Sequence, residues 1–459
     1  MKKITVSILA IGLVLSTATL CMGEIEQYRD IEPDDELTIA SFNEKVICNQ
    51  DQAKWTFMVY LSGDNNLQNI PLHPSKGKIG WMEAVGSNEN LNIVYQFDSY
   101  DYFEGTHRYY VNNGSELIES LEEQNTGDPE VLISFVDWSC NNYPADKYCL
   151  VLWGHGVGWR NGFCYDETND MDYLSMDELK YAMNEIKGNL GKNIDIILFD
   201  SCQMGMLEVY YQIRNTVDVC IGSEALLHEY GCNYHMILNK LKTDPDADAI
   251  TFADYIVDES ASYYSNCYMH VTMAAFHEET LAANVVSKLD TFAVLLEGKF
   301  STYRKEIKEA IDNTVSYNGE GGYITHYKDL YNFTQEINKR ISDGAIQQAA
   351  LDLMSEIDSS IIREEHYGWG GSHGVSIYLP TFSLRYPYDP SYEDLDLSVQ
   401  THWDEFINKC KQLVLNNNEI LSGSSIISSL PGQSLPSSSE MTGNFETSFV
   451  TNSNTLLIS

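Results

Sequence analysis

Short apolar runs recur along the first half of the chain, and each ends in a polar turn. The clearest runs cover residues 55–61, 91–98, 148–153, 194–199 and 219–223. They are rich in β-branched and aromatic residues and apolar at consecutive positions, which is typical of strands buried on both faces. Helical patterns separate these runs from one another. Strands that alternate with helices in this way predict an α/β fold with a mostly parallel sheet.

Helix start signals support this interpretation. Asp128 is a capping residue followed by Pro129, which suits the first position of a helix. Ser175 and Glu178 have the spacing of a capping box and predict a second helix. Residues 204–214 show helical spacing, so the apolar run before them should lead directly into a helix.

The pattern changes after about residue 235. Long amphipathic helices are predicted there, including 281–297 and 336–357, and two apolar stretches interrupt them at 271–276 and 374–380. Each of these stretches either extends the main sheet or belongs to a second lobe, and the pattern alone does not choose between the two arrangements.

The first residues have the features of a secretory signal peptide. Lys2 and Lys3 precede an apolar run over residues 4–20, and acidic residues follow Gly23. We expect cleavage after Gly23 and export of the mature protein. The alternative is lipid anchoring at Cys21, which is the weaker hypothesis because a bulky leucine precedes this cysteine. No later stretch approaches the roughly 18 consecutive apolar residues of a membrane span.

The composition is strongly acidic and narrows the choice of partners. The formal net charge is −39 and the isoelectric point is near 4.4, which argues against binding to nucleic acid. An acidic surface can hold calcium or attract basic peptides, but a solubilising surface is the simpler explanation.

The cysteine count fits an exported protein. Of the ten cysteines, Cys21 would be lost with the signal peptide, and setting Cys202 aside as a free thiol leaves eight. An even number is compatible with disulfides outside the cell. Their spacing contains no paired C-x-x-C arrangement of the kind found in zinc sites.

Two consecutive buried strands end in residues suited to thiol chemistry. One strand leads to His155, which lies between Gly154 and Gly156, and the next leads to Cys202. Because parallel neighbours place their carboxyl ends side by side, the imidazole and the thiol should face each other across one crevice. The backbone N–H groups of Gly156 and Cys202 could hold an oxyanion. Either residue alone would be explained by an ordinary turn or a packed cysteine; together they favour catalysis.

These residues also carry a resemblance to a known family. Residues 152–156, 199–204, 60–67 and 373–380 are similar, in this family's order, to motifs of the clostripain family of cysteine endopeptidases, relatives of caspases, gingipains and legumains. The resemblance implies a caspase-like α/β/α sandwich with a mostly parallel sheet and a helical C-terminal extension.

The resemblance also implies roles for individual residues. Cys202 would be the nucleophile, His155 the general acid and base, and backbone N–H groups would hold the oxyanion. Asp200 matches the acid at the floor of the S1 pocket, which binds the side chain before the cleaved bond (P1) and selects Arg or Lys. A buried carboxylate is costly unless a basic side chain pairs with it. Without the resemblance, Asp200 could equally well be a helix cap.

Two departures from the family pattern concern specificity and maturation. Tyr230 stands where a second S1 acid is usual, and Glu229 is the adjacent candidate acid. Between His155 and Cys202, where relatives often cut themselves, the loop 166–172 is acidic and has no basic residue. This loop could bind calcium, which some relatives need, but it lacks the glycine of an EF-hand loop. We therefore expect a solvated loop and no certain cofactor.

These observations predict five segments and one activity. The segments are a signal peptide (1–23), a leader or pro-segment (24–52), a caspase-like catalytic domain (53–234), a C-terminal part that completes the sheet and adds a helical subdomain (235–415), and a Ser- and Asn-rich disordered tail (416–459). We expect a secreted cysteine endopeptidase that hydrolyses protein or peptide bonds after Arg or Lys. The alternative is an exported binding or surface-interaction protein on the same scaffold, without turnover.

Overall fold

A computed structural model describes residues 52–73, 77–100, 105–160, 162–318, 326–380 and 389–411. The predicted signal peptide and disordered tail lie outside the described residues, as does nearly all of the predicted leader. Within the described ranges, no helix is both long enough and apolar enough to cross a membrane.

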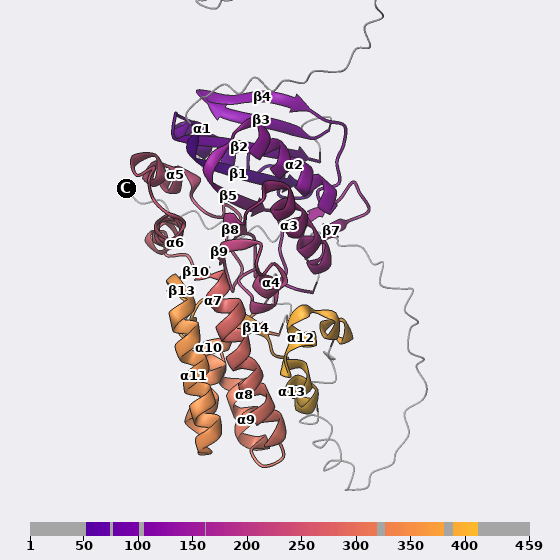
Figure 1. Cartoon of the computed structure of the whole chain (residues 1–459), viewed down its shortest axis with the longest axis vertical. Coiled ribbons are helices and arrows are strands. Elements are labelled where there is room, and N and C mark those ends of the chain that lie inside the picture. Colours follow the sequence, from indigo (N-terminus) through magenta and orange to yellow (C-terminus); the bar gives the residue numbers. More distant parts are fainter. Residues whose placement is uncertain are drawn as a thin grey trace, which may run out of the picture. The chain divides into compact units, whose positions relative to one another are not determined.

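A nine-stranded sheet forms the centre of the fold, with the order β13-β10-β9-β8-β5-β1-β2-β3-β4 (Figure 1). Its strands are β1 (Ala53–Gly63), β2 (Leu91–Ser99), β3 (His107–Asn112), β4 (Gly114–Ser120), β5 (Ala145–Trp153), β8 (Ile194–Asp200), β9 (Val217–Gly222), β10 (Val271–His277) and β13 (Ile361–Tyr367). The five central strands β2, β1, β5, β8 and β9 are parallel, and both edges are antiparallel. The central strands coincide with the five predicted apolar runs, so the mostly parallel sheet is confirmed.

Helices cover both faces of this sheet (Figure 1). One face carries α1 (Lys78–Val85), α5 (Tyr234–Thr243) and α6 (Ala249–Asn266), and the other carries α2 (Pro129–Asn142), α3 (Met176–Leu190) and α4 (Leu207–Gln212). Within β8, Ile196 and Leu198 belong to the core under α5 and α6, whereas Ile197 and Phe199 belong to the opposite core. Burial on both faces explains why this strand is apolar at consecutive positions.

The predicted helix starts are confirmed, with one shift. Asp128 caps α2, and Ser175 with Glu178 forms the capping box of α3. The helix predicted from residue 204 begins instead at Leu207. The residues directly before it remain extended, because the N–H of Gly205 donates to the carbonyl oxygen of Ser223, the residue after β9.

The C-terminal half contains mostly helices. These are α7 (Glu278–Thr280), a π-helical turn (Leu281–Val285), α8 (Val286–Gly298), α9 (Arg304–Asn313), α10 (Leu330–Arg340), α11 (Gly344–Ser360), a 3-10 turn (Pro390–Asp394), α12 (Asp396–Gln400) and α13 (Trp403–Cys410). The single helix predicted over 336–357 is wrong: Asp343 accepts hydrogen bonds from two N–H groups of α11 and starts a new helix.

The two apolar stretches of this half have different positions. Residues 271–276 form β10 and extend the main sheet, whereas residues 374–380 contain β14 (Ser376–Tyr378), which lies in a separate small sheet with β11 (Ser316–Tyr317) and β12 (Tyr327–Asp329). A two-stranded hairpin, β6 (Phe163–Asp166) and β7 (Asp172–Leu174), lies in the segment between β5 and α3.

The cysteines differ from the disulfide expectation. The eight cysteines in the described ranges are not joined in disulfides, so no disulfide forms among the candidates located there. Those that are fully buried pack in the cores as small apolar side chains: Cys149, Cys164, Cys220, Cys232 and Cys410. Burial raises the pKa of each of these thiols, which makes them poor nucleophiles.

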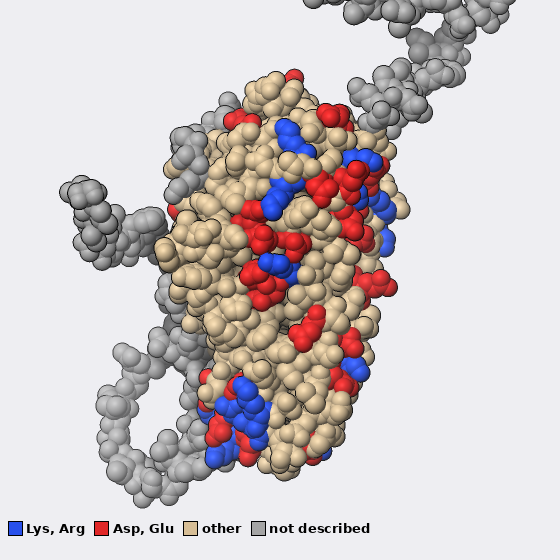
Figure 2. Space-filling view, turned by 90° about the vertical axis from the view of Figure 1, so that its left-hand side faces the viewer, with Lys and Arg blue, Asp and Glu red and all other residues tan. Residues whose placement is uncertain are grey.

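Charged side chains of both signs share the surface. Figure 2 shows Asp and Glu side chains with Lys and Arg interspersed among them on one face. The chain has 67 acidic and 28 basic residues, so the acidic side chains outnumber their possible counter-charges, and this excess gives the net charge of −39.

Candidate active site

The register of the sheet brings His155 and Cys202 to the same edge. Strands β5 and β8 are parallel neighbours, and Trp153 pairs with Asp200. His155 and Cys202 each follow two residues after this pair, beyond the carboxyl ends of the two strands. Both are partly exposed. The expected juxtaposition of an imidazole-bearing loop and a thiol-bearing loop therefore follows directly from the strand pairing.

The thiol of Cys202 lies against the segment that follows β9. The backbone N–H of Leu227 donates to Sγ at 3.3 Å, and the thiol donates to the carbonyl oxygen of the same residue at 3.5 Å. Gln203, directly after the thiol, has a φ of +58°, which turns the chain sharply away from the strand. The N–H donor stabilises the thiolate, which is the reactive form, whereas donation from the S–H to the carbonyl oxygen stabilises the neutral thiol.

His155 has a partner that the sequence analysis did not assign. Its Nε2 lies 2.6 Å from Oδ1 of Asn66. Asn66 comes shortly after β1, and β1 is the other neighbour of β5, so its loop lies beside the loop of His155. The ring of Tyr165 meets the imidazole edge to face, with centroids 6.5 Å apart. The position of Asn66 within the motif at residues 60–67 was the signal that could have identified it.

Gly156 lies against the backbone of the nucleophile. It faces Phe163 in an antiparallel bridge. The hydrogen bonds of this bridge join the neighbours of the two residues and not Gly156 itself. The N–H of Gly156 therefore points away from that strand, as an oxyanion donor must. A Cβ at this position would lie 2.7 Å from the carbonyl oxygen of Cys202, so only glycine permits this approach.

Asp200, the acid predicted at the floor of the S1 pocket, is enclosed by groups of the chain itself. Its carboxylate is fully buried, and Oδ2 lies 2.5 Å from Nζ of Lys78. The hydroxyl of Tyr234 donates to the same oxygen at 2.8 Å, and the N–H of Cys232 donates to Oδ1 at 2.9 Å. Burial lowers the pKa of Lys78, and the negative charge of Asp200 opposes that shift. The chain itself thus supplies the cation that a substrate was expected to bring.

The segment after β9 separates the two predicted S1 acids. Glu229 is exposed, and the ring of Tyr230 stacks on His228 with centroids 5.2 Å apart. Gly231 has a φ of +51°, and a Cβ there would lie 2.2 Å from Oδ1 of Asp200. Any larger residue would displace this carboxylate. Asp200 is therefore enclosed by the segment, whereas Glu229 remains at the surface.

Four carboxylates gather near the loops of this edge. Oxygen atoms of Asp64, Asp98, Glu123 and Asp166 all lie within 4.8 Å of one another. Asp98 is fully buried, and within the described part of the chain neither of its carboxylate oxygens has a hydrogen-bond partner. Burial and the three neighbouring acids raise its pKa to about 8. Such a set of oxygen donors suits a hard cation such as Ca²⁺; of the predicted loop 166–172, it includes only Asp166.

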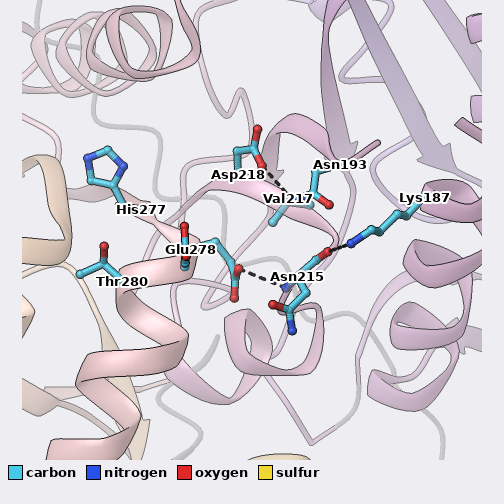
Figure 3. A pocket seen from close by; sticks show the side chains of 9 residues that line it. Lys187, Asn193, Asn215, Val217, Asp218, His277, Glu278 and Thr280 are labelled. Carbon is cyan, nitrogen blue, oxygen red and sulfur yellow. Dashed lines mark hydrogen bonds between the residues drawn. The ribbon is translucent and has the colours of Figure 1, made fainter. Parts of the chain in front are cut away.

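A separate hollow of about 340 Å³ lies away from these residues (Figure 3). Asn193 and Val217 in its lining are at the amino ends of β8 and β9, the opposite edge from Cys202. Figure 3 shows Glu278 accepting a hydrogen bond from the backbone of Asn215, at 3.1 Å. The lining contains no thiol, so this hollow is not the site of the predicted chemistry.

Comparison with known proteins identifies the family. Residues 59–410 match the clostripain family, peptidase C11. Clostripain of Hathewaya histolytica is 25% identical over 412 residues, which cover 72% of this chain and 76% of clostripain.

Two solved structures have the same fold. One is a secreted C11 cysteine protease from Bacteroides thetaiotaomicron in complex with an irreversible peptide inhibitor, with a TM-score of 0.60, 20% identity, and coverage of 78% of this chain and 99% of that chain. The other is an inactive zymogen of a C11 protease from Parabacteroides distasonis, with a TM-score of 0.59, 20% identity, and coverage of 76% and 98%. The predicted caspase-like α/β fold is thus confirmed. Because the family match spans most of the chain, this protein belongs to the clostripain family and is a cysteine endopeptidase.

Proposed function

We propose that Cys202 and His155 form the catalytic dyad of this peptidase. The observation that supports it most directly is the pairing of Trp153 with Asp200, which places the two side chains beyond the ends of adjacent parallel strands. The buried cysteines have pKa values raised by desolvation, whereas Cys202 is partly exposed and has an N–H donor at its sulfur.

The proposed reaction begins with transfer of the thiol proton from Cys202 to His155. The thiolate attacks the peptide carbonyl carbon, and the N–H groups of Gly156 and Cys202 hold the resulting oxyanion. When the intermediate collapses, the C–N bond breaks and His155 donates its proton to the leaving amine. His155 then takes a proton from water, which attacks the thioester and releases the acid product and the free thiol.

We place this activity outside the cytoplasm, on protein or peptide substrates. The predicted signal peptide at residues 1–23 supports export, and one structural neighbour is described as a secreted protease. The net charge of −39 favours peptides over nucleic acid as partners. Among the described residues, Asp64, Asp98, Glu123 and Asp166 offer a set of oxygen ligands suited to calcium.

The predicted preference for Arg or Lys at P1 needs to be modified. Because Lys78 is paired with Asp200, we propose a weaker basic preference than an unpaired Asp200 would give. Glu229 is the remaining predicted S1 acid, and it is exposed, where solvent screens its charge. A cleavage profile over P1 side chains measures this preference directly.

Two substitutions test the proposed dyad. Cys202→Ala and His155→Ala should each lower kcat/KM by at least about 1,000-fold, as expected when one member of a nucleophile–base pair is removed. Cys267→Ala and His366→Ala are matched controls, because both residues are exposed and lie elsewhere in the fold. Equal cleavage by the parent and the two dyad variants would rule out the assignment.

A labelling experiment tests the nucleophile independently of turnover. Mass spectrometry after reaction with a peptidyl acyloxymethyl ketone should find Cys202 modified before Cys267, even though Cys267 is the more exposed thiol. An inert Cys202 would contradict its assignment as the nucleophile.

A further inference from the structure

The ammonium group of Lys78 occupies a binding site for a basic side chain. Nζ lies 2.5 Å from Oδ2 of Asp200 and 2.8 Å from the carbonyl oxygen of Cys232, and it lies 4.0 Å from the centroid of the Tyr234 ring. Neither Lys78 nor Asp200 exposes any of its side chain to solvent. A carboxylate, a carbonyl oxygen and an aromatic face are the groups that recognise an ammonium or guanidinium group.

This site lies directly behind the nucleophile. Asp200 ends β8 two residues before Cys202, and both contact the same core: Cys202 packs against the core that contains Tyr234, and the hydroxyl of Tyr234 donates to Asp200. One short segment contacts both groups: Leu227 contacts the sulfur of Cys202, and the N–H of Cys232 donates to Asp200. A P1 side chain that passes the thiol toward this core therefore approaches the place that Lys78 fills.

Stability alone is a weak explanation for this ion pair. Replacing a fully buried ion pair by apolar residues of similar size is often neutral or stabilising, because two charges must lose their water. The position of Lys78, at the first residue of α1, gives the pair a functional explanation. Lys78 belongs to the segment between β1 and β2, whereas Asp200 ends β8. The cation and the carboxylate therefore come from separate parts of the chain.

We propose that Lys78 is a specificity-determining residue. It pairs with the carboxylate of Asp200, which would otherwise bind a basic P1 side chain, and the pocket therefore favours uncharged P1 side chains. This inference rests on the proposed function, since it concerns the S1 pocket of the same Cys202. It makes Lys78, rather than Asp200 alone, the residue that sets the charge of the pocket.

The test compares two peptides that differ only at P1, one with Lys and one with the uncharged norleucine. The measured quantity is the ratio of their kcat/KM values within each variant, which does not depend on the fraction of active enzyme. The parent ratio should be near unity. Lys78→Ala, which removes the ammonium group and vacates the space it fills, should raise it by about 10- to 100-fold, the range expected for one charged hydrogen bond. Lys78→Ala with Asp200→Asn should return it to the parent value.

Asp200→Asn alone provides a second test if Lys78→Ala does not fold. Asparagine is nearly isosteric and retains an acceptor for the N–H of Cys232. The ratio should fall below the parent value, because Lys78 would then present an unneutralised charge to a basic P1 side chain. Lys54→Ala is the matched control: this lysine also pairs with acids, but at the surface, and its replacement should leave the ratio unchanged.

Two results would overturn the inference while leaving the proposed function intact. One is an active enzyme whose ratio is unchanged by both Lys78→Ala and Asp200→Asn. The other is a parent that prefers Lys by about 100-fold or more and does not gain from Lys78→Ala. Absence of any cleavage, together with no labelling of Cys202 by a norleucine-P1 ketone, would instead overturn the proposed function on which the inference rests.

Discussion

A single amide fixes the tautomer of the proposed general base. With Oδ1 of Asn66 2.6 Å from Nε2 of His155, the neutral ring carries its proton on Nε2, because an amide oxygen accepts a hydrogen bond but does not donate one. Nδ1 then holds the basic lone pair that takes a proton from the thiol. Asn66 acts through His155 and is a positioning residue.

Asn66→Ala should therefore lower kcat by about tenfold with a smaller effect on KM, since the substitution removes one hydrogen bond that orients the base. Asn66→Asp retains an acceptor oxygen. It should preserve most of the activity and raise the lower pKa in the pH profile of kcat/KM, because a carboxylate stabilises the imidazolium. Steady-state kinetics over the neutral pH range measure both effects. An unchanged kcat in Asn66→Ala would contradict this role.

Partners from distant parts of the chain are what the sequence could not supply. His155 and Cys202 were predictable, because each follows an apolar run and the ends of parallel strands meet. Asn66 is 89 residues from His155, and Lys78 is 122 residues from Asp200. Nothing in a local pattern links such pairs. The S1 role of Asp200 stays a prediction: the pattern indicated a buried acid, but it could not indicate that Lys78, from an unassigned helix, pairs with it.

Strand ends hold the acidic cluster and connect it to the base. Asp64 follows β1, Asp98 lies near the end of β2, and Asp166 ends β6. The carbonyl oxygen of Asp64 accepts a hydrogen bond from the N–H of Glu167 at 2.8 Å, which ties the loop after β1 to the loop after β6. Asn66 belongs to the first of these loops, so a change at the cluster should reach the partner of His155.

Without a bound cation, the cluster should make stability depend on pH. Burial raises the pKa of Asp98 to about 8 in the folded state, above the value of about 4 in an unfolded chain. Its stabilising contribution is therefore complete below about pH 4 and is lost as the pH rises toward about 8. Asp98→Asn should flatten this part of the profile and raise the unfolding free energy at pH 8. Chemical denaturation in a chelator across this range measures it; parallel profiles for parent and variant would contradict the expectation.

Calcium should reverse that loss. At about 100 times its dissociation constant, a ligand that binds only the folded state adds about 2.7 kcal/mol. We expect Ca²⁺ to raise the Tm of the parent at neutral pH, and not that of Asp98→Asn or Asp166→Asn. Asp170→Asn is the matched control, since Asp170 is an exposed acid of the same loop with a φ of +59°, which asparagine tolerates. A calcium shift that survives Asp98→Asn would place the cation elsewhere.

Elements were predictable where one rule determined them. The central strands are apolar on both faces, and the starts of α2 and α3 carry complete capping signals, so all were identified. The helices that were misplaced depend on competing contacts. Gly205 pairs with the neighbouring segment before α4 can begin, and the cap at Asp343 divides a pattern that is apolar on both sides of it. Periodicity alone does not report such competition.

On the scale of the whole molecule, the C-terminal half is joined to the catalytic strands through one core. That core includes Phe199 of β8, Phe276 of β10 and Leu353 of α11. The N–H of Ser376 donates to the carbonyl oxygen of Gly205 at 3.0 Å, three residues after the nucleophile. The distal motif at residues 373–380 therefore holds the loop of Cys202 through this backbone hydrogen bond, although it contributes no side chain to the proposed dyad.

Glu208 is a second connection of this kind and provides a test of it. Its Oε1 accepts hydrogen bonds from the N–H of Tyr378 at 2.7 Å and from the hydroxyl of Tyr392 at 2.8 Å, and the side chain is buried. Glu208→Ala leaves both donors without an acceptor in the core, which should cost about 2–4 kcal/mol of unfolding free energy. Glu208→Gln retains an acceptor and should remain close to the parent. Because both halves share one core, calorimetry should show a single unfolding transition, and Glu208→Ala should lower its Tm. Labelling of Cys202 should be lost at the same temperature. Two transitions, of which Glu208→Ala shifts only one, would show that the C-terminal half folds independently of the catalytic strands.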